Sequence, residues 1–143
     1  MDSGTLASVF FIVVILGILL AIFLINEYRH RTWLDQHLKG RWGAVPDREY
    51  TSEELESISH YAIHHRKGKF YVDDITWNDL GLEEIFMLLN NTVSSCGEEY
   101  LYYMLRTPEQ KREVLLAREE LMEWFRTHPG ERLQLQKIFY EIR

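Results

Sequence analysis

The sequence predicts an all-α protein in which one N-terminal transmembrane helix precedes a cytosolic helical bundle. Three observations carry this prediction. The chain has no charged residue from Ser3 to Asn26, its later apolar residues recur mostly at helical spacing, and helix start and stop signals divide that later part. At 143 residues, 46% of them hydrophobic, it has room for at most one modest domain besides the span.

The apolar block Leu6–Ile25 is long enough to cross a bilayer, because 20 helical residues extend about 30 Å. A cleaved signal peptide and a buried core helix are the alternatives. A signal peptide has a basic start and a small-residue cleavage site, whereas the only charged residue before this block is the acidic Asp2. The basic residues just past the span predict a cytosolic C-terminal side and an outside N-terminus: Arg29, Arg31, Lys39 and Arg41. We therefore expect an extracytoplasmic tail over residues 1–5, a span over 6–25 and a single-pass protein of the cell membrane.

Residues 26–50 are predicted to form a juxtamembrane helix and a connector. Trp33 lies among basic residues and histidines in Tyr28–Leu38, which suits a helix at the lipid headgroups. Helix-breaking residues then predict an irregular connector over Gly40–Tyr50: Gly40, Gly43 and Pro46.

Residues 51–72 are predicted to form an amphipathic helix and an extended link. Thr51 with Glu54 has the spacing of a capping box. The apolar face that follows, Leu55, Ile58 and Ala62, predicts a short helix that ends near Arg66 and is stopped by Gly68. Lys69–Val72 is expected to run extended.

The segment 73–143 opens with two predicted helices separated by a polar joint. The first has apolar residues at helical spacing, Leu80, Ile85, Leu88 and Leu89, and ends at Asn90, Asn91 and Thr92. Ser95 with Glu98 predicts a capping box for the second helix. That helix is expected to pack through Tyr100, Leu101, Met104 and Leu105 and to end at Thr107 and Pro108.

Two further helices follow Pro108. The first has the stripe Val114, Ala117, Leu121, Trp124 and Phe125, and a turn is predicted at His128, Pro129 and Gly130. The last has Leu135, Ile138, Phe139 and Ile142 on one side. Because this stripe reaches the final residues, we expect a truncated domain that continues past Arg143.

The charge pattern disfavours a general nucleic-acid-binding surface. The net charge is −6, and Asp73–Glu99 holds seven acidic residues and no basic one, so this segment would repel phosphate. Cys96, the single cysteine, excludes an intramolecular disulfide and fits a reducing compartment. Without a base partner, Cys96 is expected to be a small buried residue rather than a nucleophile.

The sequence contains no complete catalytic, cofactor or metal motif. The Gly-Lys pair Gly68-Lys69 lacks the upstream glycine of a phosphate-binding loop. His60 and His64 lie one helical turn apart, but no third ligand stands at a suitable spacing, which favours solvated histidines over a metal site. A divalent-cation site could be formed by Asp73, Asp74 and Asp79. Alternatively, Asp74 and Glu98 could form an acid/base pair. Helix-start carboxylates on a solvated face are the expected explanation.

The order of residues from Asp73 to Pro108 resembles the beginning of the core domain of MutS, the DNA mismatch-repair family. That family has a "D..T..NLE" turn, a helix ending in "L..T" and then "T..G...L...L..P". The matching residues here are Asp74, Thr76, Leu80, Asn91, Thr92, Ser95, Gly97, Leu101, Leu105 and Pro108. The sequence around these residues resembles a bacterial branch of MutS-related proteins that begin with membrane segments. Arg112–Leu121 is similar to the next family helix, and the resemblance extends over residues 73–143.

The resemblance implies the start of a helical lever and core domain. In complete relatives this domain couples a DNA clamp to a C-terminal ATPase, so ATP and Mg²⁺ are implied only there, as are DNA binding through other domains and a homodimer or protein partner. The family's helix glycine, matched by Gly97, implies close packing between helices. We expect no catalytic site in this chain. The alternative is a small membrane-anchored helical adaptor that docks a protein partner; an independent enzyme has the least support.

Overall fold

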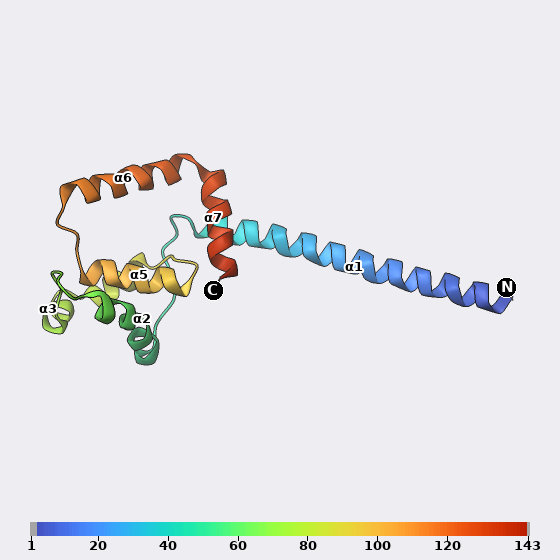
Figure 1. The fold of residues 1–143 in the computed structure, drawn as a ribbon, viewed down its shortest axis with the longest axis horizontal. Helices are drawn as coiled ribbons and strands as arrows, with labels where there is room; N and C mark the ends of the chain where they lie inside the picture. Colours follow the sequence, from blue (N-terminus) through green and yellow to red (C-terminus); the bar gives the residue numbers. More distant parts are fainter. Residues whose placement is uncertain (1–2, 143) are drawn as a thin grey trace. The chain divides into compact units, whose positions relative to one another are not determined.

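The computed structural model describes residues 3–142 and confirms an all-α chain, with seven helices and no strand among those residues. They are α1 (Ser3–Arg41), α2 (Ser52–His65), α3 (Asp74–Asp79), α4 (Leu82–Leu89), α5 (Ser95–Arg106), α6 (Arg112–Thr127) and α7 (Pro129–Glu141) (Figure 1). The chain divides into two compact units, Met1–His37 and Leu38–Arg143.

Helix α1 is one continuous helix that contains both the apolar block and the predicted juxtamembrane helix. Its portion Phe10–Arg41 is long and apolar enough to cross a membrane, judged by length and composition, and its most apolar window is not buried within the described chain. Lys39 and Arg41 lie in its last turn, where cations suit the negative end of a helix. Gly43 ends the following turn with a φ of 76°, a left-handed conformation that favours glycine.

The hydrophobic core of the second unit lies where α2 packs along α5 (Figure 1). Its buried members come from four helices and the link before α3: Ile58, Ala62, Val72, Trp77, Phe86, Tyr102 and Tyr103. Phe86 is fully buried and meets the rings of Tyr50 and Tyr102 with centroids 5.6 Å away in each case. Four aromatic residues therefore belong to the core: Trp77, Phe86, Tyr102 and Tyr103.

The region 51–72 contains the predicted capped helix. Thr51 caps α2, its hydroxyl accepting from the Glu54 N–H at 3.3 Å while the Glu54 carboxylate accepts from the Thr51 N–H at 2.9 Å. The helix buries Ile58 and Ala62 and ends at His65, and Gly68 follows with a φ of 76°. Lys69–Val72 contains no helix or strand.

The helix predicted to contain Leu80, Ile85, Leu88 and Leu89 ends as expected at Leu89, but Leu80 lies outside it because α4 begins at Leu82. Gly81 adopts a left-handed conformation with a φ of 60° and separates α3 from α4. Because this turn changes the direction of the chain, residue spacing counted across it does not define one face. The buried residues are Trp77 and Phe86, whereas the predicted apolar residues are exposed: Leu80, Ile85, Leu88 and Leu89.

The start of α5 also differs from the prediction. Ser94, not Ser95, is the N-cap, and its hydroxyl accepts from the Gly97 N–H at 3.2 Å. The cap moves by one residue because Ser94 is the position with extended backbone geometry, as an N-cap requires. Cys96 is exposed rather than buried, because it lies in the first turn beside this cap.

The predicted packing face of α5 is partly correct. Leu101, Met104 and Leu105 pack against the core while staying partly accessible, and Tyr100 is exposed. The buried positions of α5 are Tyr102, Tyr103 and Arg106.

Helices α6 and α7 pack against each other but contain no fully buried residue. Pro129 is the first residue of α7, so the turn consists of His128 alone instead of three residues. The predicted stripe residues Leu121, Ile138 and Ile142 are exposed.

A candidate coupling site between the connector and the helical core

The loop between α4 and α5, residues 90–94, forms a polar joint that is built around Asn90. The Asn90 side chain is buried, and its amide nitrogen donates to the Tyr50 hydroxyl at 2.6 Å. Its carbonyl oxygen accepts from the backbone N–H of Thr92 at 3.3 Å and from the Thr92 hydroxyl at 2.6 Å. One buried amide therefore both closes the loop and binds the connector.

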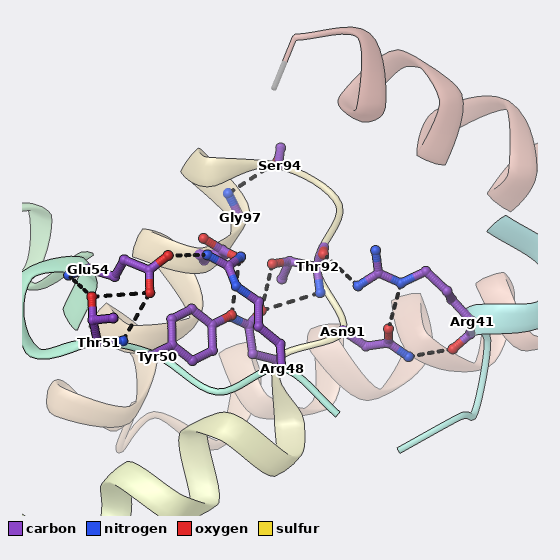
Figure 2. Close-up of polar contacts among 11 residues, drawn as sticks. Arg41, Arg48, Tyr50, Thr51, Glu54, Asn91, Thr92, Ser94 and Gly97 are labelled. Atoms are coloured by element: carbon purple, nitrogen blue, oxygen red, sulfur yellow. Dashed lines mark hydrogen bonds and ion pairs between the residues drawn. The ribbon is translucent and has the colours of Figure 1, made fainter. Parts of the chain in front are cut away.

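Asn91 holds the end of α1 from the same loop. Its Oδ1 accepts from Arg41 Nε at 3.1 Å, and its Nδ2 donates to the Arg41 carbonyl and, at 3.1 Å, to the Ala44 carbonyl. Arg41 Nη2 in turn donates to the Thr92 carbonyl at 3.2 Å. Figure 2 shows Arg41 and Asn91 facing each other with paired bonds. The Arg41 and Ala44 carbonyls lie at and just past a helix end, where backbone acceptors lack helical partners.

Glu98, in the first turn of α5, holds the other end of the connector. Arg48 Nη1 donates to its carboxylate at 2.6 Å and the Tyr50 hydroxyl donates at 3.1 Å. Arg48 also bonds Glu54 at 3.1 Å and lies over the Tyr50 ring at 4.3 Å (Figure 2). The sequence predicted that the Glu98 carboxylate bonds the cap of its own helix. In the structure it accepts instead from Arg48 and Tyr50 of the connector.

The pKa values of Tyr50 and Glu54 in this cluster depart from their ordinary values. Burial, with the nearby Glu98 carboxylate, raises the pKa of Tyr50 to about 12. The backbone N–H of Thr51, followed by the Arg48 guanidinium, lowers the pKa of Glu54. At neutral pH the tyrosine is thus a neutral donor and the glutamate a charged acceptor, which are the states that the hydrogen bonds require.

The structure brings together only part of the family-like motif. Asn91, Thr92 and Gly97 meet at the joint, while Ser95 lies one residue inside α5 and Leu101 and Leu105 pack on the core. The Thr76 N–H donates to the side chain of Asp73, the N-cap of α3, at 2.7 Å. Leu80 and Pro108 are exposed, and Asp74 forms an ion pair with Arg106.

Gly97 packs against the loop and not between helices, which corrects the expectation for this residue. A Cβ at position 97 would lie 3.1 Å from the Thr92 Cβ and 3.2 Å from the Ser94 hydroxyl. These contacts are tighter than ordinary van der Waals distance, so glycine lets the loop lie close on the first turn of α5.

Arg106 is a buried arginine of the core that the sequence pattern alone did not indicate. It is buried, donates to the Val72 carbonyl at 3.0 Å and to the Tyr102 hydroxyl at 2.8 Å, and lies 4.1 Å from the centre of the Trp77 ring. An arginine at the end of a helix usually interacts with solvent or the helix dipole. The available signal was its position among aromatic residues that can stack on a guanidinium.

The acidic residues do not gather into an acid/base pair. Asp74 pairs with Arg106 at 3.0 Å and Glu98 with Arg48 at 2.6 Å, so each carboxylate has its own cation. His60 and His64 are exposed on α2. Within residues 3–142 no group of three or more metal-ligating side chains lies close enough to hold an ion.

Comparisons of the chain with protein-family models, with curated proteins and with solved structures find no match. The class of protein that the structure defines is therefore an all-helical chain with one long apolar N-terminal helix.

Proposed function

We propose that the chain is a membrane-tethered helical coupling segment, the N-terminal part of a MutS-like lever and core domain. The observation that carries this proposal is the clamp between Asn91 and Arg41. It fastens the end of the helix with the apolar block to the joint between α4 and α5. A tether that must relay movement requires such a fixed attachment, because a flexible linker absorbs displacement instead of transmitting it.

The proposed location is the cell membrane, with one span, an outside N-terminus and a cytoplasmic second unit. The length and hydropathy of Phe10–Arg41 support the span. The basic residues after the apolar block support the orientation, since such residues stay on the cytoplasmic side.

The family assignment is supported by the order of the matched residues and by the position of three of them. Asn91, Thr92 and Gly97 make the joint between two helices, and this joint is where the connector is bound. In complete MutS-like relatives, the lever and core couple DNA binding to a C-terminal ATPase. This chain would contribute the lever, with no catalytic site, while ATP, Mg²⁺, DNA and dimer contacts would belong to other domains.

A second candidate function is a small membrane-anchored adaptor that docks a protein partner and has no relation to DNA. The exposed apolar side chains of the C-terminal helices favour it, because large exposed apolar surfaces mark interaction sites. They include Leu121, Met122, Ile138, Phe139 and Ile142.

The reading frame beyond Arg143 separates the two functions. The lever requires a downstream G-x-x-x-x-G-K-S/T phosphate loop; a stop codon at this point rejects it and favours the adaptor. If the loop is present, DNA-stimulated ATP hydrolysis by the complete protein in membranes tests the relay. Asn91→Ala is expected to lower the stimulation by DNA while basal hydrolysis is unchanged. Asn78→Ala, at an exposed position of α3, is the matched control.

Reporter fusions test the location independently. Alkaline phosphatase, which is active only outside the cytoplasm, is expected to be inactive when fused after Arg143 and active when fused before Met1. The reverse pattern refutes the proposed orientation, and a soluble, released second unit refutes the anchor.

A further inference from the structure

The second unit contains an open groove of 1280 Å³ that borders the coupling site, because Arg41, Ala44 and Asn91 are part of its lining. Its lining comes from the end of α1 and the turn after it, from α4 and the loop that follows, from α6 and from Gln136 of α7. The apolar part of the lining is Trp42, Leu88, Leu89, Leu116, Met122 and Trp124, and each of these side chains is at least 41% exposed. The groove is thus a largely exposed hydrophobic surface, although the Arg132 guanidinium of α7 lies 3.7 Å from the centre of the Trp42 ring.

The wall provided by α6 is acidic. Glu119, Glu120 and Glu123 line the groove, and Glu119 and Glu120 form no ion pair within residues 3–142. The two lining cations are already engaged, because Arg126 binds Glu123 at 2.7 and 2.6 Å and Arg41 binds the Asn91–Thr92 loop. A ligand would therefore meet net negative charge along one side of an apolar floor.

The dimensions and chemistry of the groove fit an α-helix. A helix about 10 Å wide has a cross-section of about 80 Å², so the groove volume corresponds to about 16 Å of helix, or three turns. An extended peptide would leave its backbone N–H and C=O groups unpaired against an apolar lining, whereas a helix pairs them internally. Helical walls on two sides also offer ridges into which the side chains of a further helix can pack.

We propose that this groove binds an amphipathic α-helix of a partner protein, with an apolar stripe at i, i+3, i+4 and i+7 and with lysine or arginine facing α6. The apolar stripe covers Leu88, Leu89 and Met122, and the basic flank pairs with Glu119 and Glu120. The argument depends on the groove and its charge and not on the MutS-like assignment, so it holds for either proposed function.

The test uses the full chain in nanodiscs of zwitterionic phospholipid, with empty nanodiscs as the blank. The probe is a fluorescent designed peptide of about 14 residues with leucine at the stripe positions and lysine on the flank. A matched peptide has glutamate in place of each lysine. Fluorescence anisotropy is expected to show saturable binding of the basic peptide, and binding is expected to weaken as salt is raised.

Two pairs of variants locate the binding. The double variant Glu119→Lys with Glu120→Lys is expected to bind the basic peptide with about tenfold lower affinity. Each exposed ion pair contributes a modest attraction, and the substitutions turn it into repulsion. Glu113→Lys with Glu141→Lys makes the same change of net charge at exposed positions outside the groove and is expected to leave binding unchanged. Leu88→Ser is expected to weaken binding, and Ile75→Ser, at another exposed apolar position, is its control.

Three outcomes overturn the proposal. The first is equal binding of the basic and acidic peptides, and the second is binding that Glu119→Lys with Glu120→Lys leaves unchanged. The third is concentration-dependent dimerisation of the full chain that Leu88→Ser abolishes, because it assigns the groove to a second copy of this chain. Circular dichroism of every variant shows whether the helices are retained, so loss of the fold is distinguished from loss of binding.

Discussion

Replacing Asn91 by alanine is expected to open the connector locally while the helical core stays folded. The change removes three side-chain hydrogen bonds, two with Arg41 and one with the Ala44 carbonyl. Each such bond contributes about 0.5–1.5 kcal/mol, and because the site is partly exposed we expect a total of about 1.5–3 kcal/mol. A loss of that size makes local opening about 10–150 times more frequent.

Hydrogen exchange of backbone amides measures this opening. The Ala44 amide, which donates to the Arg41 carbonyl at 3.2 Å, is expected to exchange faster by that factor. Amides in the middle of α5 are expected to keep their rates, and Asn78→Ala is expected to change neither set. Unchanged exchange at Ala44, or equal acceleration in α5, would refute the clamp as a local attachment.

Asn91→Asp separates the hydrogen bonds from the charge of Arg41. Aspartate keeps an acceptor for the guanidinium but removes both donors and turns a carboxylate oxygen toward two carbonyl oxygens. We expect exchange at Ala44 at least as fast as in the alanine variant. Exchange at the wild-type rate would mean that ion pairing with Arg41 alone holds the connector.

The remaining predictions concern the core, the loop and pH. Arg106→Met is expected to lower the free energy of unfolding by about 3–5 kcal/mol, because the Val72 carbonyl and the Tyr102 hydroxyl lose their charged donor. Denaturant unfolding followed by tryptophan fluorescence measures this free energy, and a decrease below about 1 kcal/mol contradicts the prediction. Gly97→Ala is expected to lower the free energy of unfolding by about 1 kcal/mol in the same assay, because the added methyl group contacts Thr92. Gly130→Ala has open space around it and is expected to raise the free energy of unfolding by about 0.5–1 kcal/mol. A higher free energy of unfolding for both variants would exclude close packing at Gly97. Because the pKa of Tyr50 is raised from 10.0 to about 12, the folded state holds its proton more tightly than the unfolded state, so this stabilisation is complete below pH 10 and is lost as pH rises toward 12. Unfolding titrations of the wild type and Tyr50→Phe are expected to differ in slope only in that window, and equal slopes would refute the shift.

Local signals were strongest where neighbouring residues decide the structure. The Thr51–Glu54 capping box and the apolar face of α2 needed only residues within one helix, and both were correct. The same kind of signal failed at α5, because Ser94 and Ser95 are both capable caps and the path of the preceding loop selects between them. The prediction from helical spacing also failed at Leu80, because the left-handed turn at Gly81 separates this residue from α4.

The coupling site depends on contacts between residues far apart in the sequence. Asn90 and Asn91 indicated the end of a helix, but nothing local indicated that their amides bind Tyr50, Arg41 and Ala44. A side-chain amide can pair with almost any donor or acceptor, so its partner is set by which backbone passes nearby.

By itself, the sequence determined the helical class, the long apolar N-terminal helix and the cap of α2, because helix periodicity, capping and hydropathy act over a few neighbouring residues. Only the tertiary structure decided which helix faces are buried, that Arg106 lies in the core and that the connector is fastened at the joint between α4 and α5. These features arise when distant segments exclude water together, and one-dimensional spacing contains no information about which segments meet.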